Sequence, residues 1–187
     1  INKVREDFKK AAKRADKAGF DIIEIHGAHG YLLHSFFSPL SNQRNDQYGG
    51  SFENRIRLAL EIIADIKSVW PDNKPLFYRL SSIDAPGQGA NLEDNIMLAK
   101  SLKSVGVDVI DCSSGGITGS PVLTKSKIIP GFQVPYSEKI KKDAEISSMA
   151  VGAIISADQA NEIISNKRAD LVAVSYTHLT LPTICSV

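Results

Sequence analysis

The chain has 187 residues, of which 43% are hydrophobic and 23% charged, with a formal net charge of +1 at pH 7. These values are typical of a globular protein, and a charge so near zero gives no electrostatic basis for binding nucleic acid or an anionic membrane. No apolar run approaches the roughly 20 residues of a membrane span. The two cysteines, Cys112 and Cys185, have no disulfide or metal-ligand spacing. We expect a cytoplasmic protein with no nucleic-acid or membrane partner.

Amphipathic helices alternate with short apolar runs along the chain. The first predicted helix places Phe8, Ala11 and Ala15 on one face, and Gly19 ends it. The predicted helices cover residues 4–18, 52–69, 92–104, 136–144 and 157–165. The predicted strands cover residues 20–25, 75–80, 107–112, 150–155 and 169–174. Strands that alternate with helices imply parallel βαβ units and an α/β fold.

Two features favour a (β/α)8 TIM barrel over an open doubly wound sheet. No strand is followed by a G-x-G-x-x-G fingerprint. In addition His26, Arg79, Ser113 and Gly152 lie at or near strand ends, which converge on the mouth of such a barrel. A complete barrel takes about 250 residues. Because this chain is shorter and begins with a helix, we expect a fragment that holds roughly strands 4 to 8.

The segment Glu24–Leu33 places two histidines, His26 and His29, three apart among glycines, with Tyr31 two residues later. The imidazoles could bind a metal, bind a substrate oxygen or cap a loop. A three-histidine zinc site with His34 is conceivable. No Asp, Glu or Cys lies nearby at ligand spacing, since Glu24 points to the other side of its strand from Ile25. We therefore predict no metal and assign His34 to helix packing.

The last 13 residues, 175–187, break the alternation of strands and helices. They contain no charged side chain apart from one histidine, and threonine, proline and β-branched residues argue against a helix. The string resembles the translation of sequencing-adapter DNA. We therefore expect residues 1–174 to form the native domain and residues 175–187 to be a non-native tail, to which we assign no function.

The segment from His26 to Arg55 resembles the Old Yellow Enzyme family of FMN-dependent ene-reductases. The tract Asp111–Gly116 and the segment Pro130–Val134 are similar to its thermophilic-like bacterial class. The likeness runs from about residue 4 to residue 174. It implies that residues 1–174 are part of an FMN-binding TIM barrel, which takes NADPH or NADH as reductant and reduces the C=C bond of enones. It also implies a homo-oligomer for the full-length protein.

The resemblance assigns the carbonyl-binding pair to His26 and His29, with Gly27 and Ala28 between them in the substrate site. The chemistry agrees, because two N–H donors aimed at a carbonyl oxygen stabilise the negative charge that develops there. Tyr31 matches the family position that gives a proton to the α-carbon, as a phenol that is protonated at neutral pH can do.

The resemblance also assigns three residues to the cofactor. Arg79 matches the arginine beside the flavin N1/O2 edge, where a cation stabilises the reduced anionic flavin; the open alternative is an ion-pair partner in the barrel interior. Gly152 and Ala153 match the first of two loops that bind the FMN phosphate through backbone N–H groups. The second family loop has Gly-Arg directly after the last strand, whereas this sequence has Ser175 and Tyr176 there.

Two other functions stay open at this point. The same barrel forms the first domain of larger flavin proteins with an iron–sulfur cluster, such as dienoyl-CoA and bile-acid reductases. Their cluster cysteines lie beyond the barrel; the tract Asp111–Gly116 favours the stand-alone class. A barrel that only binds a phosphorylated ligand is the second alternative, and the joint presence of His26, His29, Tyr31 and Arg79 argues against it.

Overall fold

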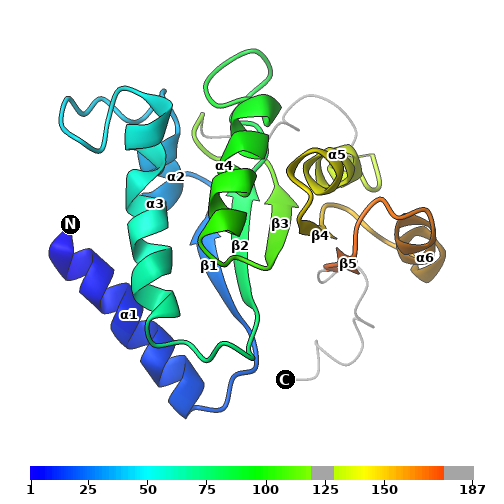
Figure 1. Cartoon of the computed structure of the whole chain (residues 1–187). Coiled ribbons are helices and arrows are strands. Elements are labelled where there is room, and N and C mark those ends of the chain that lie inside the picture. Colours follow the sequence, from blue (N-terminus) through cyan, green and yellow to red (C-terminus); the bar gives the residue numbers. More distant parts are fainter. Residues whose placement is uncertain (119–128, 175–187) are drawn as a thin grey trace, which may run out of the picture.

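The structure, a computed structural model, describes residues 1–118 and 129–174. The expected tail, residues 175–187, lies outside the described residues. The helices are α1 (Asn2–Lys17), α2 (Leu32–Phe37), α3 (Phe52–Lys67), α4 (Leu92–Ser104), α5 (Val134–Ala144) and α6 (Ala157–Ser165). The strands are β1 (Ile23–Gly27), β2 (Leu76–Ser81), β3 (Val109–Ser113), β4 (Ser147–Ala150) and β5 (Leu171–Val172). Figure 1 shows them in chain order from the N-terminal α1 to β5.

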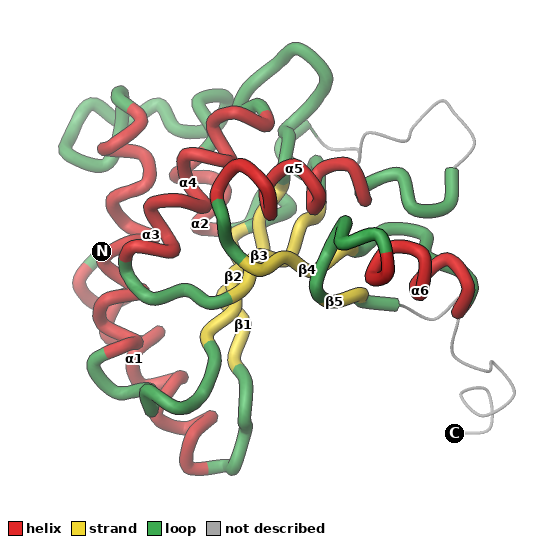
Figure 2. Tube along the Cα trace, turned by 45° about the vertical axis from the view of Figure 1, so that its right-hand side comes forward, coloured by secondary structure: helices red, strands yellow, loops and turns green. Residues whose placement is uncertain are grey.

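The strands form one parallel sheet in the order β1-β2-β3-β4-β5, so each strand pairs with the next one along the chain. A doubly wound sheet reverses its order at a switch point, whereas a (β/α) barrel continues in sequence. The described sheet shows no such reversal. Its order is therefore that of an arc of a barrel, with the helices along its outer side (Figure 2).

The two faces of β1 show which side of the sheet is the outer one. Ile25 and Gly27 are buried toward the helices, whereas Glu24 and His26 lie on the opposite face, where each side chain is partly accessible to solvent. Alternate residues of a strand point to opposite faces. Glu24 and His26 therefore lie on the face that corresponds to the inside of a barrel.

The main core lies between the sheet and the helices α1, α3 and α4. Helix α3 begins where the Ser51 side chain accepts a hydrogen bond from the N–H of Asn54, and its buried isoleucines recur at helical spacing. Helix α4 begins with a capping box between Asn91 and Asp94. The fully buried side chains from these elements include Leu58, Ile62, Ile63, Ile66, Leu76, Tyr78, Leu80, Leu98 and Leu102. This packing fixes the strands, and therefore the loops at their carboxyl ends.

The fourth predicted strand is wrong in its position. Residues 150–155 read as an apolar β-rich run, but the strand is Ser147–Ala150. Gly152 and Ala153 have φ values of 113° and 50°, and two residues with positive φ cannot continue a strand. The run is therefore mostly the loop that follows β4.

Two further differences lie around the first strand. The prediction of residues 20–25 begins too early, since β1 begins at Ile23, and Phe20 and Ile22 are exposed. The sequence also did not predict α2, in which Leu33 and Phe37 are buried one turn apart. A helix of 6 residues is too short for its periodicity to be seen.

Candidate active site

Three aromatic rings meet at the carboxyl end of β1. His26 lies in the last part of that strand, and the centroid of its ring is 5.3 Å from that of His29. The centroid of the Tyr31 ring lies 5.1 Å from that of His26. The structure therefore brings together the three residues that the sequence predicts as catalytic.

The backbone of the histidine turn (residues 28–31) is held in an uncommon conformation. His29 and Gly30 have φ values of 57° and 78°, a region that costs an L-residue free energy. The His29 N–H donates to Ser81 Oγ at 3.0 Å, and that hydroxyl donates to the carbonyl oxygen of Gly115 at 2.7 Å. A Cβ on Gly30 would lie 2.4 Å from the carbonyl oxygen of Gly116. Only glycine therefore allows this turn to approach the loop after β3.

The His29 ring has a partner on the third strand. Its Nε2 lies 2.6 Å from Ser113 Oγ, the last residue of β3. Burial, followed by the positive charge of Arg79 and the neighbouring histidines, lowers the pKa of His29 to about 4. Burial and Arg79 also lower the pKa of His26. Both imidazoles are therefore neutral near pH 7, and each can donate one N–H hydrogen bond.

Arg79 lies on β2, in register with His26 on one side and Asp111 on the other. Its Nε is 3.3 Å from Asp111 Oδ2, and the Asp111 side chain is only 1% exposed. Within the described residues this ion pair is the one polar contact of the guanidinium, so its terminal nitrogens remain available to another group. The ion pair that the sequence left open is therefore present, and it is compatible with a cofactor role.

Glu24 extends this charged cluster. Burial and the negative charge of Asp111 raise the pKa of Glu24 to about 7, against the opposing effect of Arg79. The buried Asp111 Oδ1 has no donor when both carboxyl groups are ionised. Burial raises the pKa of Asp111 as well, against the opposing effects of Arg79 and Glu24, so we infer that the two carboxyl groups share one proton. The cluster then holds one positive and one negative charge beside His26.

The loop after β4 turns its backbone in a way that suits an anion. Gly152 and Ala153 both have positive φ, and their carbonyl oxygens accept from the N–H of Gly131. Across residues 1–118 and 129–174, no hydrogen bond engages the N–H groups of these two residues. Free N–H groups in such a turn are the donors that phosphate sites use.

Gln133 ties this loop to the end of β3. Its Oε1 accepts from Ser114 Oγ at 2.5 Å, and its Nε2 donates to the carbonyl oxygen of Val151 at 3.1 Å. A hollow of about 350 Å³ is lined by His29, Ser113, Ser114, Gly116, Phe132 and Gln133. The hollow joins the histidine turn to the segment that holds the β4 loop.

Two predicted substrate residues face the core. Gly27 is buried, and a Cβ there would lie 2.2 Å from the Tyr78 ring. Ala28 is also fully buried. The sequence placed both among the substrate-binding residues, but neither presents a side chain to the exposed face of the sheet. Their backbone links His26 to His29.

The sequence did not assign a role to Ser81, and Ser113 was noted only for its position. These serines end β2 and β3 in register with each other, and both contact His29. Polar residues at neighbouring strand ends were the signal that could have identified them. His34 is buried, as expected for helix packing. In the described part of the chain no group of three or more His, Cys, Asp or Glu residues could hold a metal ion, and no helix there could cross a membrane.

The sequence of the chain is similar to those of bacterial NADPH dehydrogenases. The chain is 51% identical over 182 residues to an NADPH dehydrogenase of Halalkalibacterium halodurans. This match covers 97% of this chain and 52% of that protein. It is 48% identical over 174 residues to an NADPH dehydrogenase of Bacillus subtilis. That match covers 93% of this chain and 50% of the relative. The chain therefore spans about half the length of these curated relatives.

Solved structures share the fold. Morphinone reductase in complex with tetrahydroNAD is 26% identical with a TM-score of 0.69, over 92% of this chain and 44% of that one. Histamine dehydrogenase from Rhizobium sp. 4-9 is 28% identical with a TM-score of 0.80, over 92% of this chain and 25% of that one. A 2-naphthoyl-CoA reductase, at 24% identity and a TM-score of 0.84, shows the fold alone. The predicted fold class, part of a (β/α)8 barrel, is thereby confirmed.

A sequence model of the NADH:flavin oxidoreductase / NADH oxidase family matches residues 1–186. This match confirms the resemblance to the Old Yellow Enzyme family of FMN-binding oxidoreductases, and the relatives that match over about half their length are NADPH dehydrogenases. The chain belongs to the FMN-dependent NADH:flavin oxidoreductase / NADH oxidase family.

Proposed function

We propose that the protein is an FMN-dependent reductase that uses NADPH or NADH to reduce the activated C=C bond of α,β-unsaturated carbonyl compounds. The observation that carries this proposal is the ring cluster of His26, His29 and Tyr31 at the carboxyl end of β1. The cluster lies beside the Arg79–Asp111 pair, on the face of the sheet that corresponds to the barrel interior.

The two histidines bind the substrate carbonyl oxygen. Negative charge develops on this oxygen as the C=C bond is reduced, and preorganised N–H donors stabilise it. His26 and His29 are neutral near pH 7, so each donates an N–H hydrogen bond to the carbonyl oxygen without bringing a full positive charge to the site. Bound FMN supplies the hydride for the β-carbon, after reduction by the nicotinamide.

Tyr31 delivers the proton that the α-carbon requires. Its side chain is 63% exposed and lies against the ring of His26, one of the two carbonyl-binding histidines. A substrate whose carbonyl oxygen is bound by His26 and His29 therefore presents its unsaturated carbons near the phenol. A positioned acid of this kind contributes about a hundredfold or more to a rate.

The residues present fit FMN. The terminal nitrogens of Arg79 are available to the flavin ring edge, while the carboxylate of Asp111 lies 3.3 Å from its Nε. The backbone N–H groups of Gly152 and Ala153 are available to the phosphate group. These assignments deepen the proposal, since each uses a donor that nothing in residues 1–118 and 129–174 otherwise engages.

The barrel domain of a larger FMN and iron–sulfur reductase is the second candidate. The histamine dehydrogenase and 2-naphthoyl-CoA reductase chains that share the fold are covered to 25% and 29%. NADPH dehydrogenases at 48% and 51% identity, each covered to about half, favour the stand-alone enzyme. Iron analysis of the purified intact protein distinguishes the two, because only the second candidate contains a cluster.

The test replaces His26 and His29 with alanine, singly and together, in the intact FMN-loaded protein. Loss of one oxyanion donor costs roughly 3 kcal/mol of barrier, about a hundredfold in rate. Stopped-flow absorbance follows flavin reduction by NADPH and flavin reoxidation by cyclohexenone separately. We expect reoxidation to slow far more than reduction. Reoxidation of the double variant at the parental rate would show that the carbonyl-binding assignment is wrong.

A further inference from the structure

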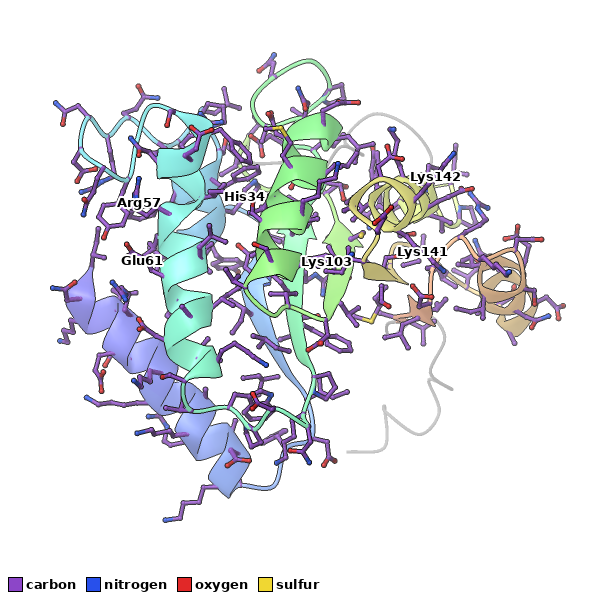
Figure 3. All side chains as sticks on the ribbon, viewed as in Figure 1. His34, Arg57, Glu61, Lys103, Lys141 and Lys142 are labelled. Carbon is purple, nitrogen blue, oxygen red and sulfur yellow. The ribbon has the colours of Figure 1, made fainter. Side chains whose placement is uncertain are left out.

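A buried polar cluster lies behind the histidine turn. His34 on α2 and Asp84 in the loop after β2 are both fully buried, with His34 Nε2 2.6 Å from Asp84 Oδ1. The other carboxyl oxygen of Asp84 accepts from Ser38 Oγ at 2.5 Å and from the Ala90 N–H at 2.7 Å. Figure 3 shows His34 inside the molecule, between the ribbons of α3 and α4. We call these four residues the Asp84 cluster.

The opposite nitrogen of His34 contacts the histidine turn itself. The backbone N–H of Gly30 donates to His34 Nδ1 at 2.9 Å. A nitrogen that accepts a hydrogen bond carries no proton, so the ring proton of neutral His34 lies on Nε2. That proton points to Asp84, which only accepts when ionised. The two contacts therefore require the same tautomer, and Asp84 selects it.

We propose that His34 is a positioning residue that sets the orientation of His29, with Asp84 holding His34 in the tautomer that accepts from Gly30. This inference rests on the proposed role of His29 in binding the substrate carbonyl. His29 and Gly30 are adjacent and both have positive φ. Each has its N–H anchored by a side chain from another position, His29 by Ser81 and Gly30 by His34.

The geometry gives His34 more than a packing role. A buried imidazole that served only to fill space would leave two polar nitrogens without hydrogen-bond partners, which costs free energy of folding. Here both nitrogens are paired, and the partners come from the histidine turn and from the loop after β2. The Asp84 loop is itself closed, since the N–H of Asp84 donates to the carbonyl oxygen of Ala90. The closed loop after β2 therefore fixes the orientation of the His34 ring, and the ring holds the histidine turn through Gly30.

Two substitutions at His34 separate its nitrogens. In His34→Asn the side-chain oxygen can occupy the Nδ1 position and accept from Gly30, while the contact to Asp84 is lost. In His34→Gln the amide nitrogen can reach the Nε2 position and donate to Asp84, while the acceptor for Gly30 is lost. In Asp84→Asn the new side-chain NH₂ group lies among the three donors that Asp84 accepts from, namely His34, Ser38 and Ala90. An NH₂ group needs an acceptor, so this variant favours the His34 tautomer with its proton on Nδ1.

The first measurement needs no turnover. In the intact protein labelled with ¹⁵N-histidine, long-range ¹H–¹⁵N correlation spectra identify the His34 tautomer, and amide hydrogen exchange reports the Gly30 N–H. We expect the Nε2–H form in the parent protein. We expect exchange at Gly30 to be faster in His34→Gln and Asp84→Asn than in His34→Asn. A parent protein with Nδ1–H, or equal exchange in all three variants, would overturn the inference.

The second measurement is flavin reoxidation by cyclohexenone. We expect His34→Gln and Asp84→Asn to slow it about tenfold to a hundredfold, through a higher KM for the enone and a lower kcat, with His34→Asn closer to the parent. Ser38→Ala is the control, since it weakens the Asp84 cluster without removing the acceptor for Gly30; its melting temperature should fall with little change in rate. If Ser38→Ala slowed reoxidation as much as His34→Gln, the role would be structural only.

The two proposals fail in different ways. If the parent protein did not reduce enones, the proposed function would be wrong, while the His34 tautomer and the Gly30 exchange would still test the inference. If the parent reduced enones and the tautomer were Nδ1–H, the function would stand and the inference would be wrong.

Discussion

His29 Nε2 and Ser113 Oγ lie 2.6 Å apart, so a ring in the turn between β1 and α2 contacts the last residue of β3. Two arrangements of the proton are compatible with this contact. Either Nε2–H donates to the serine, or the serine donates to Nε2 and the ring proton lies on Nδ1. The proposed carbonyl-binding role requires the second, because it leaves an N–H free to reach the substrate.

Replacement of Ser113 with alanine should therefore weaken carbonyl binding without removing the ring. Loss of one net hydrogen bond is worth about 1 kcal/mol, so we expect flavin reoxidation by cyclohexenone to slow about fivefold. Flavin reduction by NADPH should change less. Stopped-flow kinetics measure both steps.

Ser114→Ala is the matched control for this change. Ser113 and Ser114 are both 5% exposed, and Ser114 donates to Gln133 instead of contacting His29. The two variants should lose similar stability, but only Ser113→Ala should slow reoxidation. Equal rates in both variants would show that Ser113 does not act through His29.

A pair of glycine substitutions tests the close approach of the histidine turn to the loop after β3. Gly30 and Gly50 have φ values of 78° and 81°. A Cβ on Gly30 would lie 2.4 Å from the Gly116 carbonyl oxygen, whereas a Cβ on Gly50 would meet nothing within 4 Å. Both alanine variants pay about 1–2 kcal/mol for the left-handed backbone.

Gly30→Ala should lose a further 1–3 kcal/mol or so to the steric overlap. Urea denaturation curves of the two variants give this difference in the free energy of unfolding, because the backbone strain is common to both. Equal losses would mean that the loop after β3 moves away freely, and that the histidine turn is not held by Gly116.

The fold was predictable because its signals are local and repeated. The helices α3 and α4 carry long periodic patterns, and their predicted ranges, 52–69 and 92–104, agree with the structure to within two residues. The strand after α5 was misplaced because Val151 and Ile154 look β-prone, while Gly152 decides the backbone. Apolar composition alone does not show where φ becomes positive.

The candidate site was predictable in the residues that a local motif carries, but not in the contacts that hold them. The resemblance carried by the segment His26–Arg55 assigned roles to His26, His29 and Tyr31, which lie within six residues of one another. Their partners lie far along the chain, with Ser113 84 positions from His29 and Asp84 50 positions from His34. Such contacts depend on the register of β2 and β3, which no local pattern specifies.

The carboxyl pair of Glu24 and Asp111 predicts a pH-dependent stability. Burial and Asp111 raise the pKa of Glu24 from 4.5 to about 7 in the folded protein. The folded state therefore binds this proton more tightly than the unfolded chain does, so stability from Glu24 is full below about pH 4.5 and is lost as the pH rises to about 7.

Glu24→Gln keeps the shape of the protonated side chain and cannot ionise. We expect its melting temperature to match that of the parent protein near pH 4.5 and to exceed it at pH 8. Glu6→Gln, on the exposed surface of α1, is the control for removing one negative charge. A stability difference for Glu24→Gln that stayed constant from pH 4.5 to pH 8 would contradict the shared proton.

Tyr31→Phe separates proton delivery from substrate binding. The Tyr31 side chain is 63% exposed, and its one aromatic contact in the described structure, to His26, does not need the hydroxyl. Stability should therefore stay within about 0.5 kcal/mol of the parent, and enone affinity should be unchanged. Reoxidation by cyclohexenone should slow by about tenfold to a hundredfold, since solvent replaces part of a general acid worth about a hundredfold or more.

The solvent isotope effect on this step identifies the proton donor. In the parent protein the phenolic proton is transferred as the α-carbon is protonated, so the rate in D₂O should fall. In Tyr31→Phe the proton comes from water, and both the rate and its isotope effect should differ from those of the parent. Tyr136→Phe, which removes a phenol from α5, should change neither. If Tyr31→Phe kept the parental rate and isotope effect, another group would be the acid, and Tyr31 would serve only as a wall beside His26.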